Sequence, residues 1–375
     1  MKTYPIYVKA VYLLLLAFLF FYGLVYAKFI LVPLTLGCLF SILLTPIASR
    51  FEKWGLHRTF SSLLCIIIMG LIVAILIFLL SRQIMAFLNN LPELTVQLDT
   101  RLNDIQAYIE RQTNLTPTHQ IDWLKNEIST SGSLFSGALS ATTSTFATMA
   151  LIPLYTFFLL FYRDKIQLFF EKITPEQQHY TVHQIIHRIK EVVQSYLSGV
   201  IIVMFIVSAM ISTGLAIIGV PYAIFLGVLA GILNVIPYIG ILTAASLAIL
   251  MAAITLGNPS APLFVLFVFL GTHLLEANII TPNIVGSKVS INPLASILAL
   301  IIGEEVWGIV GMILFIPLLG IVKVMFDNIK PLEPYAFILG TEGQDEHSIS
   351  WRGTWRRVKR IFIRKPHPNM DKNQE

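Results

Sequence analysis

The sequence has little charge: 13% of its 375 residues are Asp, Glu, Lys or Arg, against roughly 25% in soluble domains. It has only two cysteines, Cys38 and Cys65, which lie in apolar runs and in no CxxC or zinc-like spacing. We therefore expect neither a disulfide framework nor a metal cluster. It also has no HExxH, no GxSxG and no paired intramembrane Asp motif, which argues against an enzyme. We expect no cofactor.

Apolar residues dominate instead: 56% of the chain is hydrophobic, and the mean hydropathy is +0.76. One or two water-facing domains cannot hide so much apolar surface, so the lipid bilayer is the expected solvent. Soluble enzymes, transcription factors and disordered scaffolds are excluded. The net charge of +5 needs no nucleic acid partner, because basic residues border the hydrophobic segments of inner-membrane proteins.

Apolar runs of about 20 residues predict helices that cross a bilayer. The first run resembles a signal peptide, but a second one follows it directly, so we read the first as a span too. The sequence thus predicts an all-α integral membrane protein with about six full crossings. Three lie within residues 1–81, at 10–27, 29–48 and 60–81, and the others at 145–162, 196–218 and 262–280.

The polar segments predict the topology. Residues 82–144 hold four Lys or Arg and six Asp or Glu, with Leu or Ile recurring every three or four residues, which predicts a small amphipathic helical insert. Residues 163–195 predict a cytoplasmic helix that continues into the next span. Lys and Arg are in excess in 49–60, 163–195 and 331–375, which places both termini inside and 82–144 outside. A bacterial inner membrane fits this pattern.

Two apolar runs, 222–256 and 294–326, are too long for one crossing. A straight helix of 35 residues would span about 52 Å, beyond a hydrocarbon core of about 30 Å. We predict that both runs, within a transport core at 196–330, fold back as broken or re-entrant hairpins. The alternative is that each run crosses once, which gives eight spans.

Proline and glycine mark the expected breaks, because proline lacks a backbone donor and glycine permits turns. The first run has Pro237 and Gly240 at its middle, and both are also candidates for the substrate or ion pathway. The second has several such residues, Gly303, Gly308, Gly311 and Pro317. Aligning Pro221 on Pro293 gives a loose match between the runs, which suggests the inverted repeats of secondary transporters. Apolar membrane sequences also look alike by chance.

Polar residues in these segments are candidates for a substrate or ion pathway, because a charge at the bilayer centre costs about 2.5–3.5 kcal/mol. His273 and Glu276 are three apart, so they share a helix face and could pair, line a wet cavity or exchange a proton. The alternative is that Glu276 is solvated near the inner surface. Asn278 follows in the same span, and Asn234 is the polar residue nearest Pro237.

Glu304 and Glu305 interrupt the second run near its expected tip. A carboxyl group in a low-dielectric setting favours a proton or a small cation as partner, so these residues are candidates for coupling or gating. The alternative is a tip that protrudes into water. Broken helices also leave backbone amides and carbonyls that can bind a substrate or an ion directly.

The basic tail predicts a helix on the membrane surface. Trp351 and Trp355 recur at helical spacing among Arg356, Arg357 and Arg360. This pattern suits an interfacial helix bound to anionic headgroups, with nucleic acid binding as the weaker alternative.

Several stretches together resemble the autoinducer-2 exporter family of bacterial membrane proteins. They are Pro237-Tyr238-Ile239-Gly240, the eleven residues from Glu276 to Gly286 (EANIITPNIVG), Asn292-Pro293-Leu294, and Gly303 through Gly311 followed by Ile316-Pro317-Leu318. The resemblance implies a multispanning exporter or permease that forms a homo-oligomer, with pentamers among its relatives. It also implies export of a furanone signal, as for some members, or sodium/proton exchange, as for others.

The leading interpretation is a secondary transporter that alternates access around the two broken runs. It would move a small polar solute of the autoinducer-2 type, or an ion, with coupling to protons or cations. A sodium/proton antiporter is one alternative, and a non-transporting scaffold or channel is the other.

Overall fold

A computed structural model describes residues 5–113, 143–237, 239–285 and 291–341, and every regular element in these ranges is helical. The predicted all-α class is therefore confirmed. Within the described residues, six helices are long and apolar enough to cross a membrane. They are Tyr7–Tyr26, Lys28–Lys53, Arg58–Gln83, Glu176–Ile218, Ala261–Ile284 and Ile309–Asp327. Five of them match predicted crossings, and the sixth lies in the second long run.

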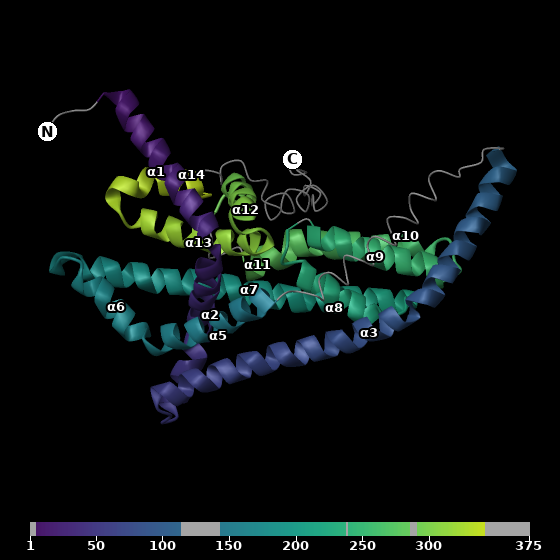
Figure 1. Ribbon diagram of the computed structural model, residues 1–375, viewed down its shortest axis with the longest axis horizontal. Helices are drawn as coiled ribbons and strands as arrows, with labels where there is room; N and C mark the ends of the chain where they lie inside the picture. Colours follow the sequence, from purple (N-terminus) through teal and green to yellow (C-terminus); the bar gives the residue numbers. More distant parts are fainter. Residues whose placement is uncertain (1–4, 114–142, 238, 286–290, 342–375) are drawn as a thin grey trace, which may run out of the picture.

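The first three helices are α1 (Ile6–Tyr26), α2 (Lys28–Lys53) and α3 (Arg58–Thr113). The 56-residue α3 runs far beyond the other helices (Figure 1). The predicted boundary between a span ending at 81 and an insert starting at 82 thus falls inside one continuous helix. The residues after 82, which repeat Leu or Ile every three or four positions, belong to the same helix as the span before them. The rest of the predicted insert, residues 114–142, lies outside the described residues.

The next helices are α5 (Thr143–Phe161), α6 (Arg163–Lys172) and α7 (His179–Ile218), with a 3₁₀ turn, η1 (Glu176–Gln178), before α7. Helix α5 lies where a crossing is predicted at 145–162, and its apolar part Ala150–Phe161 is shorter than the six spanning helices. Residues 163–195, predicted as a cytoplasmic helix, form α6, η1 and the start of α7, so the helix that continues into the next span begins at His179. Pro175 explains the division, because a proline disfavours helical backbone in the residue before it. Helix α7 itself continues from a polar start into an apolar end.

The first long run folds back on itself as α8 (Ala223–Leu233) and α9 (Ile239–Thr255). Helix α7 ends at Gly219, whose φ of 87° reverses the chain, and α8 returns along it. Gly227 and Gly231 of α8 face Ser212 and Ser208 of α7 so closely that a methyl group on either glycine would overlap the serine side chain. Small residues four apart let two helices approach in this way.

The main hydrophobic core lies among α7, α8, α9 and α10 (Ala261–Leu275), which run side by side (Figure 1). On α9, Ala244, Ala248 and Ala252 recur every four residues and are buried. On α10, Val265 and Phe269 fill the opposing side. This packing holds the break between α8 and α9 in place against the end of α10.

The second long run also folds back, as α12 (Pro293–Trp307) and α13 (Ile309–Asp327). The chain turns at Gly308, whose φ of 65° favours glycine. Gly303 and Gly311 then face each other, and a Cβ on Gly303 would lie 2.5 Å from the Gly311 carbonyl oxygen. Pro317 is buried within α13 and does not end the helix, contrary to the predicted break there. Neither long run is thus one straight rod.

Hydrogen bonds attach the second hairpin to the first helix and to the segment after the last described helix. Asn292 caps α12 by accepting from the Ala295 amide at 2.8 Å, and its own side-chain amide donates to the Gly340 carbonyl after α14 (Glu333–Leu339). At the hairpin turn, the Trp307 indole N–H donates to the Leu24 carbonyl of α1 at 3.0 Å. The Leu24 carbonyl can accept this bond because α1 ends before Ala27, so the usual α-helical donor four residues further on is not in the same helix.

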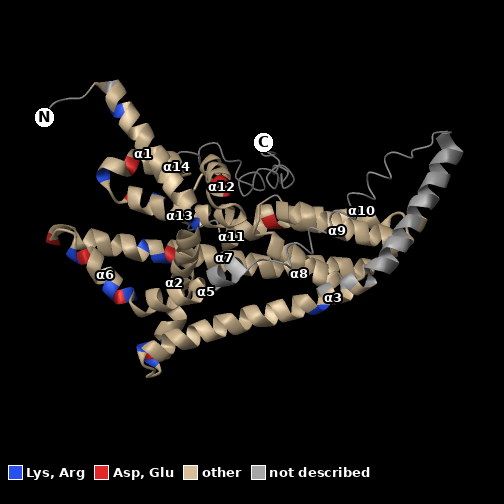
Figure 2. Ribbon diagram, viewed as in Figure 1, with Lys and Arg blue, Asp and Glu red and all other residues tan. Residues whose placement is uncertain are grey.

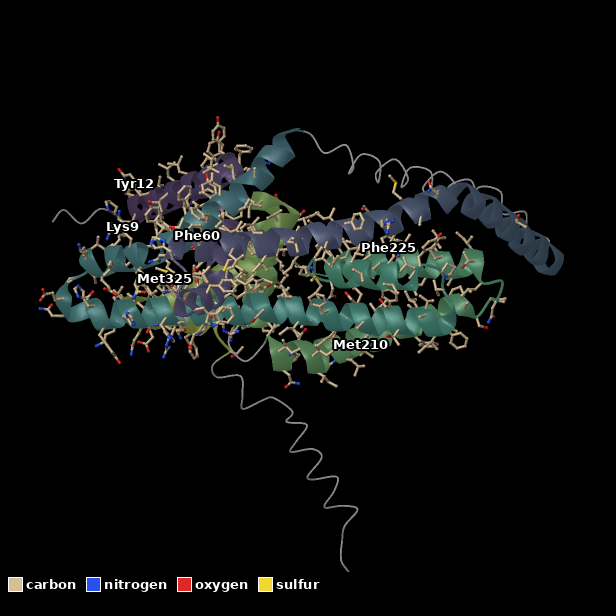
Figure 3. All side chains as sticks on the ribbon, turned by 90° about the horizontal axis from the view of Figure 1, so that it is seen from below. Lys9, Tyr12, Phe60, Met210, Phe225 and Met325 are labelled. Atoms are coloured by element: carbon tan, nitrogen blue, oxygen red, sulfur yellow. The ribbon has the colours of Figure 1, made fainter. Side chains whose placement is uncertain are left out.

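Charged residues gather at one end of the molecule, around the α2–α3 turn, α6 and the start of α7 (Figure 2). Two ion pairs join these elements there: Arg58 to Asp164 at 2.6 Å and Arg163 to Glu52 at 2.5 Å. Helices α8 and α9 carry no Asp, Glu, Lys or Arg among their described residues. The outer surface is apolar: side chains point away from α1 along its length, as Tyr12 does (Figure 3). Such a surface suits lipid or another subunit.

Candidate functional site

The break between α8 and α9 forms one side of the candidate site. Proline at 237 has no N–H, and the Val235 amide bonds to the Ile232 carbonyl instead of the Gly231 carbonyl four residues back. Gly240 then lies so close to the Leu233 carbonyl oxygen that no side chain could fit there. Of the last carbonyls of α8, only that of Gly231 is therefore left without a backbone donor in the described contacts, at the negative end of the helix dipole.

A π-helical turn, η2 (Glu276–Ile280), forms the opposite side, between α10 and the short α11 (Thr281–Ile284). The cause of this turn is local. Pro282 has no N–H to donate to the Asn278 carbonyl, so the series of α-helical backbone hydrogen bonds is interrupted there. The Thr281 amide bonds to the Glu276 carbonyl five residues back. Turns of this kind occur frequently at functional sites. The end of α11 packs on α7, where Val285 lies against Gly199.

The wider turn brings Thr281 onto the same face as Glu276. In a regular α-helix, residues five apart lie about 140° apart around the axis. Here the Thr281 hydroxyl donates to Oε1 of Glu276 at 2.6 Å. The other carboxylate oxygen, Oε2, lies 3.6 Å from Nδ1 of His273. The Glu276 side chain is 15% exposed and that of His273 is 51% exposed. The acid thus has a partner on each side.

Two cavities adjoin this carboxylate. The larger, about 480 Å³, lies among the α8–α9 break, α9, α10 and α12 and has a mostly apolar lining with His273 in its wall. The smaller, about 200 Å³, lies among α7, α8, α11 and α13, with Tyr196, Gly231 and Thr281 in its wall. Both cavities share three residues: Asn234, Pro237 and Glu276. The sequence predicted each of these three as pathway residues, and the structure brings them together.

Glu276 is the only acid among the described lining residues of the two cavities, and no Lys or Arg lines either one. The larger cavity can hold a small solute, since apolar walls with a few placed polar groups are typical of small-molecule sites. The carboxylate between the cavities can exchange a proton or attract a cation.

Of the other predicted pathway residues, His273 lines the larger cavity, whereas Gly240, Asn278, Glu304 and Glu305 line neither. The Asn278 side chain is exposed and donates to the Leu274 carbonyl at 2.8 Å, so it serves the backbone of the π turn. Glu304 and Glu305 are exposed on α12 near the hairpin turn and line neither cavity. Trp351, Trp355, Arg356, Arg357 and Arg360 lie outside the described residues.

Sequence reasoning missed Thr281. The residue lies five positions after Glu276, a spacing that places the two on different faces of an α-helix. Only the π turn aligns them. The proline directly after Thr281 was the available signal, because it interrupts the ladder where the wider turn forms.

Helices long enough to span a bilayer, two hairpins broken inside apolar runs, and a carboxylate between two cavities define a multi-pass membrane protein of the transporter type. Comparison with known sequences agrees, since residues 11–330 match the model of the AI-2E family transporter. The chain therefore belongs to the AI-2E family of membrane transporters.

Individual relatives align over most of their length. The chain is 29% identical over 319 residues to "Putative transport protein YrrI" of Bacillus subtilis, which covers 80% of this chain and 86% of the relative. It is 26% identical over 321 residues to the AI-2 transport protein TqsA of Escherichia coli, which covers 84% of this chain and 91% of that relative. These names describe transport rather than catalysis.

Proposed function

We propose that this protein is a secondary transporter that exports a small polar solute of the autoinducer-2 type, coupled to protons or cations through Glu276. The observation that carries the proposal is the pair of cavities that share this carboxylate with Asn234 and Pro237. The name of the relative TqsA supports the solute class. The larger cavity would hold the solute, with His273 and Asn234 as hydrogen-bonding groups.

The proposed setting is the bacterial inner membrane with both termini inside, as the distribution of Lys and Arg suggests. The proposed assembly is a homo-oligomer in contact with anionic lipid. The apolar surface of α1, of which no part of the spanning window is buried, leaves room for such a neighbour.

Transport into inside-out membrane vesicles tests the role of Glu276. We expect Glu276→Gln to lower autoinducer-2 uptake at least fivefold and to flatten its pH dependence, because the amide can neither release a proton nor attract a cation. Radiolabelled or bioassayed autoinducer-2 measures the uptake.

Glu304→Gln is the matched control, because it makes the same change at an exposed carboxylate outside both cavities. We expect its uptake to stay within twofold of the wild type. Uptake and pH dependence that are unchanged in Glu276→Gln would contradict the coupling role. Sodium-driven proton movement without any solute uptake would favour the antiporter instead.

A further inference from the structure

Helix α6 has its polar and apolar faces reversed relative to a helix on the surface of a soluble protein. Such a helix buries its apolar stripe and exposes its polar one. In α6 the half-buried side chains are Arg163, Gln167 and Glu171, which are polar and recur every four residues. The rest of the helix is exposed. The polar stripe of α6 therefore faces the protein.

Hydrogen bonds to neighbouring helices hold this polar stripe in place. The Gln167 side-chain oxygen accepts from Nζ of Lys190 on α7 at 3.2 Å, and Nε2 of Gln167 lies 3.2 Å from Nδ1 of His183. Arg163 donates to the Glu52 carboxylate at the end of α2 at 2.5 Å. These contacts fix the rotation of α6, so its apolar side chains cannot turn inward without breaking them.

The apolar face of α6 consists of Leu168, Phe169, Phe170 and Ile173, the last of which caps the helix. Each of these side chains is between 46% and 62% exposed. Phe169 follows Gln167 by two residues, about 200° around the helix, so it points away from the polar stripe. Large apolar side chains grouped in this way disfavour water and mark a contact surface.

The place of α6 in the chain indicates that a membrane surface covers this face. Helix α6 begins only one residue after the apolar α5 ends at Phe161, so its start lies at the end of a membrane helix. Nζ of Lys165 lies 5.7 Å from the centre of the exposed Tyr162 ring. Tyrosine and lysine side chains are typical of the boundary between hydrocarbon and headgroups.

The charges of α6 select the kind of lipid. Asp164 pairs with Arg58 at 2.6 Å, whereas the exposed Lys165 and Lys172 pair with no acid among the described residues. Both lysines lie in the charged end of the molecule around α6 (Figure 2). Exposed lysines beside an apolar helix face are typical of helices that bind anionic membrane surfaces.

We propose that α6 lies in the membrane surface as an interfacial helix. Its apolar face enters the boundary between headgroups and hydrocarbon, and Lys165 and Lys172 contact anionic headgroups. Because Gln167 also holds Lys190, the membrane surface anchors the start of α7. This surface is separate from both cavities, and the placement holds whether or not the protein transports a solute.

The depth of a spin label on the apolar face tests this placement. Phe169→Cys is labelled in full-length protein without Cys38 and Cys65, in nanodiscs of phosphatidylcholine and phosphatidylglycerol. Oxygen concentrates in hydrocarbon and a nickel chelate stays in water, so we expect oxygen to relax the label more strongly than nickel. The matched control is a label at Gln177→Cys, an exposed polar position in the turn after α6, where nickel should be the stronger.

Removal of the lysine charges tests the headgroup contact. The double change Lys165→Gln and Lys172→Gln should lower the oxygen-to-nickel ratio at residue 169 at least threefold. Pure phosphatidylcholine nanodiscs should lower the ratio similarly in the protein with both lysines. Lys9→Gln combined with Lys330→Gln removes two exposed charges from other helices and should leave the ratio unchanged.

Stronger relaxation by nickel than by oxygen at residue 169 would overturn the proposal, because the face would then lie in water. Poor access of both reagents would also overturn it, and dipolar broadening between labels would then identify a second copy of the chain as the cover. A ratio that responds neither to the lysine changes nor to lipid charge would overturn the contact with anionic headgroups.

Discussion

At the scale of single residues, side chains replace hydrogen bonds that prolines remove from the helices. Pro46 of α2 cannot donate to the Ile42 carbonyl four residues back. The Gln194 side-chain amide of α7 donates to this carbonyl at 2.9 Å. One polar residue therefore both satisfies a partly buried backbone oxygen and joins two helices.

This contact predicts a coupled effect on stability. Gln194→Leu should lower the free energy of unfolding by about 1–2 kcal/mol, because it leaves the Ile42 carbonyl without a partner. In a Pro46→Ala background the alanine amide can bond to Ile42, so the same change should cost clearly less. Thermal unfolding in detergent measures all four proteins of the cycle.

Gln184→Leu is the control for the glutamine position, because Gln184 is exposed on the same helix. It should change stability by less than about 0.5 kcal/mol. Equal costs of Gln194→Leu in both backgrounds would show that the hydrogen bond to Ile42 is not the cause.

At the scale of elements, both long apolar runs are hairpins with unequal arms. Helix α8 has 11 residues and α9 has 17, while α12 has 15 and α13 has 19. At 1.5 Å per residue, α8 covers only about 16 Å of a core of about 30 Å. Helix α13 is long enough to cross by itself. The sequence predicted that both runs break into halves of about equal length, but the arms are unequal.

The close approach of the arms of the second hairpin predicts the effect of a methyl group. Gly311→Ala should destabilise the protein by about 1–3 kcal/mol, because the new Cβ would meet the backbone of Gly303 on the opposite helix, which has no rotamer to change. Thermal unfolding in detergent again measures the effect.

Gly271→Ala is the matched control, because a Cβ at this α10 position has no neighbour within 4 Å. It should be neutral, or stabilising by up to about 1 kcal/mol through helix propensity. If Gly311→Ala were as stable as Gly271→Ala, the arms would not pack as closely as described.

At the scale of the whole molecule, the uneven distribution of charge gives the protein two different ends. The loops around 54–57 and 173–178 lie near the ion pairs of Arg58 and Arg163, while the loop at 256–260 lies at the other end of α7 and α10 (Figure 1). Positive residues favour the cytoplasmic side, so the two ends should face opposite compartments.

Cysteine labelling in intact cells tests this sidedness. In a background without Cys38 and Cys65, a membrane-impermeant maleimide should label Asn258→Cys from outside. It should label Gln177→Cys only after the membrane is opened. The opposite pattern would invert the proposed topology, and labelling of both from outside would contradict a crossing between them.

Composition and the lengths of the apolar runs by themselves determined that the protein lies in a bilayer, that it is all-α and that two of the runs are broken. A bilayer requires long apolar helices and limits their length. The sequence also singled out Asn234 and Glu276, since polar groups in apolar runs are costly, and Pro237, since it breaks a helix. Tertiary structure decided which of them meet. In the folded chain, Glu304 and Glu305 lie away from the two cavities. The Asn278 side chain donates to the Leu274 carbonyl, and the Thr281 hydroxyl donates to Glu276. These outcomes depend on how each helix is rotated and on packing between segments far apart in the sequence. A sequence pattern that assumes the regular α-helical repeat contains no information on either.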